Sequence, residues 1–174
     1  NLNSDIAKTT LSDMVMQGLL VALGNKDVGS GTRFFTDQGW SKLGNKIQDA
    51  LSHYHQQFPL RRGIPKEELR SRIAMTSQDF NDTLVLLNEK GTTMEDGAIV
   101  RLPEHKPAFT ESQKDSVISY LQLLESDPYS PPTNSPINSE ILNLLAEEGQ
   151  VVKVSESVVF STKAYQHMVD KISS

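Results

Sequence analysis

The chain has 174 residues, with 17 Lys and Arg against 22 Asp and Glu, and no cysteine. The net charge of −5 argues against a protein that coats nucleic acid nonspecifically, because such binding rests on an excess of Lys and Arg. Without cysteine there are no disulfides, thiolate metal sites or cysteine nucleophiles. The longest apolar run, residues 19–23, is far shorter than the roughly 20 residues of a transmembrane helix. The start of the sequence has neither a signal peptide nor an initiator Met, so we expect a fragment of a longer protein.

One arrangement occurs three times along the chain: a helix that ends in Gly, a hairpin of two short strands, and a Ser- or Thr-capped helix. Gly closes a helix cheaply because it adopts the left-handed conformation, and short β-branched or aromatic segments around polar turns are typical of hairpins. The helices that end in Gly are predicted over residues 11–17, 80–90 and 139–148. The strand pairs are predicted over residues 19–23 and 32–35 around the Gly-rich turn 24–31, over 92–94 and 98–102, and over 151–154 and 158–160.

Each hairpin leads into a helix with a regular apolar stripe. The predicted N-caps are Thr36, Thr110 and either Ser161 or Thr162, whose side chains accept hydrogen bonds from the first helical turn. Apolar residues then recur every three or four positions, which indicates amphipathic helices. The three stripes consist of Trp40, Leu43, Ile47, Leu51, Tyr54 and Phe58; of Val117, Ile118, Leu121 and Leu124; and of Tyr165, Met168, Val169 and Ile172.

Two short helices complete the middle unit. The first is predicted over residues 65–73, with Pro65 in its first turn. The second is predicted to begin at a Ser77 cap, with its apolar positions facing inward at Phe80, Leu84 and Leu87. Three helices followed by a hairpin form a winged helix, in which the third helix and the wing usually read nucleic acid.

The predicted fold is mostly α with small β-hairpin wings (α+β), arranged as tandem winged-helix domains. The Pro-rich segment 128–136 cannot hold a normal helix, so the second helix of the third unit is expected to be abbreviated. Four parts are predicted. Residues 1–37 are the C-terminal part of a first winged helix, and residues 38–103 are a second winged helix. Residues 104–162 are a third winged helix, and residues 163–174 are the opening helix of a truncated fourth.

Charge is unevenly spread along the chain. Residues 39–103 carry 9 basic and 8 acidic side chains, whereas residues 104–174 carry 5 and 10. Five basic side chains fall within twelve residues and are candidates for RNA phosphate contacts: Arg61, Arg62, Lys66, Arg70 and Arg72. The alternative is a solvated helix face, diluted by Glu67 and Glu68, with one arginine paired to a carboxylate of a neighbouring unit.

Enzyme chemistry has little support in these residues. His53 and His55 are two positions apart and point to different faces of a helix, while His105 and His167 are isolated, so structural or exposed histidines are favoured over a metal site. The sequence contains neither a phosphate-binding GxxxxGK[ST] loop nor a GxSxG nucleophile motif. We predict no catalytic residue, no metal site and no bound cofactor in this fragment.

Residues 54–73 carry an aromatic-His, Pro-Leu-Arg, Gly and Glu-Glu-Leu-Arg-Ser-Arg signature. This signature resembles the C-terminal winged-helix region of the bacterial selenocysteine-specific elongation factor family, SelB. The resemblance continues through Pro131-Pro132, the helix 140–149 and the hydrophobic wing after it, and covers essentially the whole chain.

The resemblance implies a cytoplasmic translation factor whose N-terminal domains, absent here, bind GTP with Mg and selenocysteinyl-tRNA. It further implies an arm of four winged helices. The last of these binds the mRNA selenocysteine-insertion hairpin and lies mostly outside this chain. The fragment is then a spacer that reaches the ribosome only within the full-length protein. We expect it to be monomeric and to have no membrane partner.

Two other functions stay open. A winged-helix transcriptional regulator would bind DNA through its third helix, but the candidate helices, which begin at residues 78 and 138, have acidic starts that disfavour phosphate. A protein-interaction module would use the apolar wing Val158–Phe160 as an edge strand.

Overall fold

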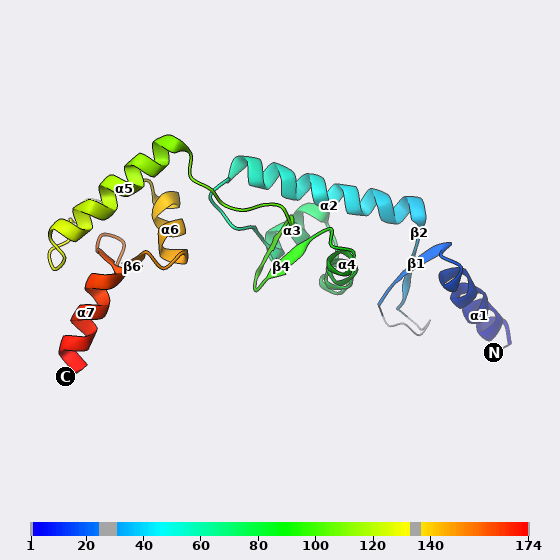
Figure 1. Cartoon of the computed structure of the whole chain (residues 1–174). Helices are drawn as coiled ribbons and strands as arrows, with labels where there is room; N and C mark the ends of the chain where they lie inside the picture. The colour runs from blue at the N-terminus through cyan, green and yellow to red at the C-terminus, as the bar shows by residue number, and fades with distance from the viewer. Residues whose placement is uncertain (1, 25–30, 133–136, 174) are drawn as a thin grey trace. The chain divides into compact units, whose positions relative to one another are not determined.

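The computed structural model describes residues 2–24, 31–132 and 137–173 (Figure 1). The chain forms two compact units. Unit 1 comprises Asn1–Gln57 and Arg62–His105, and unit 2 comprises Phe58–Arg61 and Lys106–Ser174. The described residues are mostly helical, with three small antiparallel sheets, which confirms the predicted α+β class. No helix in this part of the chain combines the length and the apolar character needed to cross a lipid bilayer.

Unit 1 begins with a helix and a hairpin. Helix α1 (Leu2–Met16) extends further towards the N-terminus than the predicted residues 11–17, and Gly18 follows it with a φ of +72°. Strands β1 (Leu20–Leu23) and β2 (Arg33–Thr36) pair antiparallel in the register Leu20 to Thr36. Of the predicted turn 24–31, residues 25–30 lie outside the described residues.

Helix α2 (Asp37–Gln57) connects this hairpin to the winged helix. The Thr36 hydroxyl oxygen accepts a hydrogen bond from the Gly39 N–H at 3.1 Å, as expected for a cap. Most residues of the predicted apolar stripe face the core, because Trp40, Ile47, Leu51 and Tyr54 are buried.

The winged helix is completed by β3 (Ile64–Pro65), α3 (Lys66–Ile73), α4 (Ser77–Glu89), β4 (Met94–Asp96) and β5 (Ile99–Arg101). The strand order β3-β5-β4 places the two-residue β3 beside the hairpin, so the sheet has three strands rather than the two predicted. The predicted inward positions are confirmed: Phe80, Leu84 and Leu87 are almost fully buried.

Two predicted helix starts in this unit are wrong by one position. Pro65 is not in the first turn of α3; its backbone is extended and pairs with Ile99. An edge strand tolerates a proline because its outward side needs no N–H donor. The cap of α4 is Thr76 rather than Ser77, since the Thr76 side chain accepts the Asp79 N–H at 3.3 Å.

Unit 2 holds α5 (Glu111–Ser126), α6 (Ser139–Glu147), β6 (Val151–Lys153), β7 (Val159–Ser161) and α7 (Thr162–Ser173). Thr110 forms a reciprocal capping box with Gln113, and the Ser161 hydroxyl accepts the Ala164 N–H at 3.2 Å, so both predicted caps are present. No second helix interrupts residues 127–132, the part of the Pro-rich segment that is described; residues 133–136 lie outside the described residues.

The core of unit 2 is aliphatic. It is built from buried residues of α5, α6 and both strands, together with one residue from the turn after α2: Val117, Tyr120, Leu124, Ile141, Leu142, Leu144, Leu145, Val151, Val159 and Leu60. The predicted inward position of Ile118 is wrong, because its side chain is 54% exposed and Tyr120 takes the place in the core. The stripe on α7 is largely at the surface, with Tyr165, Val169 and Ile172 all exposed.

Candidate nucleic-acid interface

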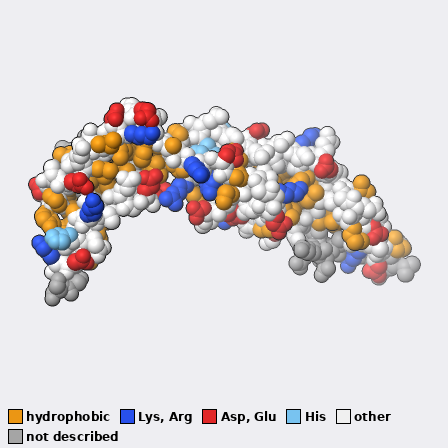
Figure 2. Space-filling view, in the orientation of Figure 1, with side chains coloured by type: hydrophobic (Ala, Val, Ile, Leu, Met, Phe, Trp, Pro, Cys, Tyr) orange, Lys and Arg blue, Asp and Glu red, His pale blue; other side chains and the backbone are white. Residues whose placement is uncertain are grey.

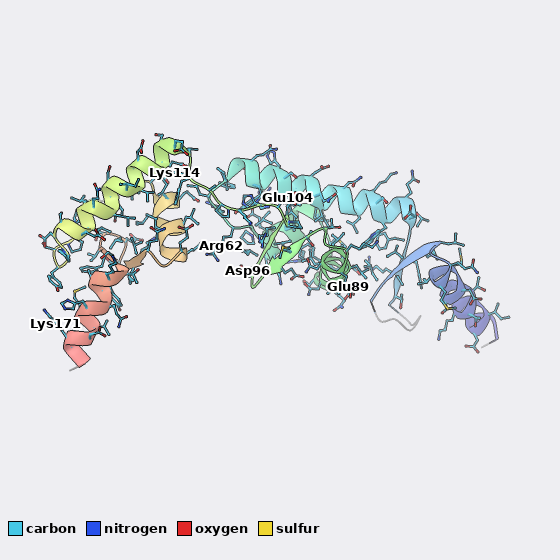
Figure 3. The ribbon with its side chains drawn as sticks, in the orientation of Figure 1. Arg62, Glu89, Asp96, Glu104, Lys114 and Lys171 are labelled. Atoms are coloured by element: carbon cyan, nitrogen blue, oxygen red, sulfur yellow. The ribbon has the colours of Figure 1, made fainter. Side chains whose placement is uncertain are left out.

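The five basic candidates are divided between the two units. Arg61 belongs to unit 2, whereas Arg62, Lys66, Arg70 and Arg72 belong to unit 1. Arg62 is exposed in the segment that leads to β3 (Figure 3). The other three lie on α3, the second helix of the winged helix.

Arg61 makes a two-pronged ion pair with Glu140, in the first turn of α6. Its Nε donates to Glu140 Oε2 at 3.0 Å and its Nη2 donates to Oε1 at 2.6 Å. The guanidinium also lies 4.1 Å above the centre of the Phe58 ring. The hydrogen bond from Arg61 lowers the pKa of Glu140, since it favours the charged carboxylate. This contact joins the turn after α2 to α6 and gives Arg61 a structural role in unit 2.

The basic residues of α3 are each paired with a glutamate. Lys66 pairs with Glu95 of β4, Arg70 with Glu67 through an Nε–Oε2 distance of 3.0 Å, and Arg72 with Glu68 at 2.6 Å. These pairs are at least partly exposed, so each stabilises the fold by only about 0–1 kcal/mol. A phosphate can therefore displace a glutamate from these cations. Until it does, the glutamates neutralise much of the local positive potential.

The elements that usually read nucleic acid are acidic here. Helix α4 contains no Lys or Arg, and it carries Asp79, Asp82 and Glu89. The wing adds Glu95 and Asp96; Glu89 and Asp96 are exposed and are labelled in Figure 3. Figure 2 shows red and blue side chains intermixed over the described residues of this region, without a continuous blue patch on the face drawn. Helix α4 therefore offers a phosphate no cation of its own, and Asp82, Glu89 and Asp96 oppose its approach.

Two further cations of unit 1 were missed by the sequence reasoning. Arg33 of β2 pairs with Asp79 at 2.9 Å, and Lys46 of α2 donates to the Ile73 carbonyl at 3.0 Å. Both are far from α3 in sequence, so no local spacing could have pointed to them. Lys46 sits where α3 ends and exposes carbonyl groups, a position in which a cation is favourable.

The winged-helix segment also matches a known family by sequence. Residues 48–102 match the family model described as "Elongation factor SelB, winged helix". These residues are similar to the winged helix of SelB. The match contains all five basic candidates and the signature at residues 54–73, and so confirms the resemblance seen in the sequence.

One solved structure is similar to this chain. It is the crystal structure of a bacterial selenocysteine-specific elongation factor, EF-Sec, with 13% sequence identity and a TM-score of 0.41. The similarity covers 86% of this chain and 24% of that one, so the present chain spans about a quarter of that protein. A search of curated protein sequences found no match.

Inside the winged helix, His55 is a structural residue. Its buried Nε2 accepts the backbone N–H of Leu102 at 3.2 Å, and its ring stacks on His105 with 3.6 Å between centroids. The prediction that His105 is isolated is therefore wrong. Burial, followed by the charge of His105, lowers the pKa of His55 to about 4, so the ring is neutral near pH 7. Among the described residues, no three His, Asp or Glu side chains are grouped so as to hold a metal ion.

Proposed function

We propose that the chain is part of the winged-helix arm of a selenocysteine-specific elongation factor. The observation that carries this proposal is the match of residues 48–102 to the SelB winged-helix family. On this proposal the arm joins a body that binds GTP, Mg and selenocysteinyl-tRNA to a further winged helix that binds the mRNA selenocysteine-insertion hairpin. The full-length factor then works on the ribosome in the cytoplasm. The same proposal divides the chain into four winged-helix parts, which end at residues 37, 103, 162 and 174.

The charges of the winged helix support a spacer rather than a reader of nucleic acid. Helix α4 lacks basic residues, and the cations of α3 are paired with glutamates. A reader needs several Lys or Arg side chains aimed at phosphates, because these supply most of the binding free energy. The same argument disfavours the alternative of a DNA-binding regulator, which would need a basic α4.

The geometry of unit 1 also suits a spacer. Helix α2 has 21 residues, which corresponds to a length of about 32 Å at about 1.5 Å per residue. One end of α2 contacts β1 and β2, and the helix also packs against α3. A single long helix thereby fixes the spacing between the first hairpin and the winged helix, as the linking role requires.

A gel-shift titration with the insertion hairpin tests the proposed division of labour. We expect the chain alone to bind the hairpin no more tightly than a scrambled hairpin of the same length. The same chain extended by a complete fourth winged helix should bind the true hairpin specifically. Specific, salt-resistant binding by the chain alone would contradict the spacer role.

The basic candidates need a separate test, since their RNA contacts stay a prediction. The variant Arg62→Glu/Arg70→Glu/Arg72→Glu should weaken binding of the extended protein to tRNA or ribosomes if these residues touch phosphates. Lys42→Glu/Lys114→Glu/Lys153→Glu, three lysines outside this group, is the charge-matched control. Unchanged affinity of the triple variant would remove these residues from the RNA-contact set.

A further inference from the structure

Unit 2 contains an open pocket away from the basic residues of α3. It lies between the end of α5, the residues that follow it, and the start of α7, and has a volume of about 420 Å³. Its walls include Glu125, Pro128, Tyr129, Lys163 and His167. A volume of this size lies within the range of small-ligand sites.

Tyr129 belongs to the Pro-rich segment, for which the sequence predicted only that no normal helix forms. Its side chain is 53% exposed at the pocket, an unusual position for a large aromatic side chain. The Tyr129 hydroxyl lies 2.5 Å from His167 Nδ1, and this contact fixes the ring against α7. The two rings are 6.1 Å apart between centroids and tilted by 35°, so both present π-surface at the same opening.

Two lysines lie beside this aromatic pair. Lys163 lines the pocket, and the Lys171 Nζ lies 5.6 Å from the centre of the Tyr129 ring. Figure 2 shows pale blue and blue side chains over α7, and Figure 3 labels Lys171 at the outer side of this helix. Glu125 is the acidic group of the wall, where its carboxylate can accept hydrogen bonds.

We propose that this pocket binds one unpaired nucleotide of RNA, an inference that rests on the proposed role in translation. The base stacks on Tyr129 and His167, its exocyclic amine donates to Glu125, and the flanking phosphates contact Lys163 and Lys171. Aromatic platforms beside cations are the usual way in which proteins hold single-stranded nucleic acid. A paired base does not fit, because its faces are covered by its neighbours in the duplex.

Fluorescence anisotropy with the whole chain tests the proposal. The probes are a fluorescein-labelled adenosine octamer, a uridine octamer and a fully paired RNA duplex of the same length. We expect the single strands to bind more tightly than the duplex, and the adenosine octamer more tightly than the uridine octamer because only adenine carries an exocyclic amine. Equal binding of octamer and duplex, or no binding of either octamer, would overturn the proposal.

The variants separate stacking from a merely structural role of Tyr129. Tyr129→Ala should weaken octamer binding about tenfold or more, since one base–aromatic stack is lost. Tyr129→Phe should keep most of the affinity, because the ring remains and only the hydroxyl contact to His167 is lost. Equal losses in the two variants would mean that Tyr129 acts by holding α7 in place. Tyr165→Ala, on the exposed part of α7, is the aromatic control and should leave binding unchanged.

The lysines are tested by salt dependence. Lys163→Gln should reduce the slope of log affinity against log salt by about 0.7, the value for one phosphate contact on a single strand. Lys114→Gln removes a lysine that is paired with Glu111 on α5 and should leave the slope unchanged. An unchanged slope in Lys163→Gln would contradict the phosphate contact.

The outcome is separable from that of the proposed function. If Tyr129→Ala leaves octamer binding unchanged while the extended chain still binds the insertion hairpin, the pocket proposal fails alone. If the octamer binds through Tyr129 while the extended chain does not recognise the hairpin, the proposed function fails and the pocket stands.

Discussion

Gly63 lies so close to Val100 that a methyl group on Gly63 would be 2.5 Å from the Val100 carbonyl oxygen. The two residues lie on neighbouring segments, because β3 pairs with β5 in the register Ile64 to Val100. The close approach lets a two-residue strand join the hairpin and turns the wing into a three-stranded sheet.

Gly63→Ala should therefore destabilise unit 1. The obstacle is backbone rather than a flexible side chain, so we expect a loss of about 2–3 kcal/mol in the free energy of unfolding. Urea titration followed by the fluorescence of Trp40, the sole and buried tryptophan, measures it. Gly44→Ala is the matched control in α2, where the new methyl meets only Leu87 Cδ2 at 3.9 Å. It should stabilise by about 0.5–1 kcal/mol, and a harmless Gly63→Ala would contradict the close packing.

Ala74 ends α3 in a left-handed conformation, with φ of 61° and ψ of 50°. This conformation costs a residue with a side chain roughly 1–2 kcal/mol. Ala74→Gly removes this cost from the folded state, but it also raises the entropy of the unfolded chain, which is destabilising. We expect the first effect to be larger, with a net stabilisation of about 0.5–1 kcal/mol in the same urea titration. Ala50→Gly, in the middle of α2, should instead destabilise by about 1 kcal/mol. Destabilisation by both changes would show that Ala74 is not strained.

Acid should unfold unit 1 through His55. Its pKa is lowered to about 4 in the folded state, from the ordinary 6.5, so the unfolded chain takes up the proton first. The stability that the neutral ring provides is complete above pH 6.5. It is lost as the pH falls towards 4, by on the order of 3 kcal/mol. Trp40 fluorescence at a series of pH values measures this loss.

His55→Gln should flatten this pH dependence, because a glutamine oxygen accepts the Leu102 N–H without titrating. His53→Gln, at an exposed position on the same helix, is the control and should leave the dependence unchanged. A His55 ring that titrates near pH 6.5 by NMR would refute the buried, neutral state.

The Arg61–Glu140 ion pair should contribute modestly to unit 2. Both side chains are more than a third exposed, so we expect a coupling of about 0.5–1 kcal/mol that falls with added salt. Because the pKa of Glu140 is lowered in the fold, this contribution is present above its unfolded pKa and disappears as the pH falls through the folded value.

A double-mutant cycle with Arg61→Met and Glu140→Gln measures the coupling through hydrogen exchange of the Leu144 and Leu145 amides. The exposed Arg70–Glu67 pair, three positions apart on α3, gives the reference for a surface contact. A coupling no larger than this reference would mean that Arg61 does not hold α6.

Local patterns predicted most of the helices and hairpins, because caps, glycines and apolar spacing act over a few residues. Thr36, Thr110 and Ser161 were found in this way. Strand β3 was missed, since it has two residues and its partner lies about 35 positions away. Ile118 was misplaced because Tyr120, two positions further along and on another face of α5, packs into the core instead.

The candidate sites were harder to predict than the fold, because they depend on contacts between residues that are far apart in the sequence. The basic run at residues 61–72 was visible in the sequence, but its division between two units was not. The pairing of Arg61 with Glu140 spans 79 positions, and the contact between Tyr129 and His167 spans 38. Spacing along a chain carries no information on such contacts, so the charge balance of α3 and the pocket at Tyr129 emerge only from the folded structure.

The most direct test of the arm is a reporter in which selenocysteine insertion at an in-frame UGA codon produces an active enzyme. The full-length factor that contains this chain is supplied to cells that lack their own, either intact or with a flexible Gly/Ser linker in place of residues 38–103. We predict that the intact factor supports insertion and that the linker version loses most of it while still binding the insertion hairpin. Full insertion by the linker version would contradict the spacer role, and no insertion by the intact factor would contradict the proposed function itself.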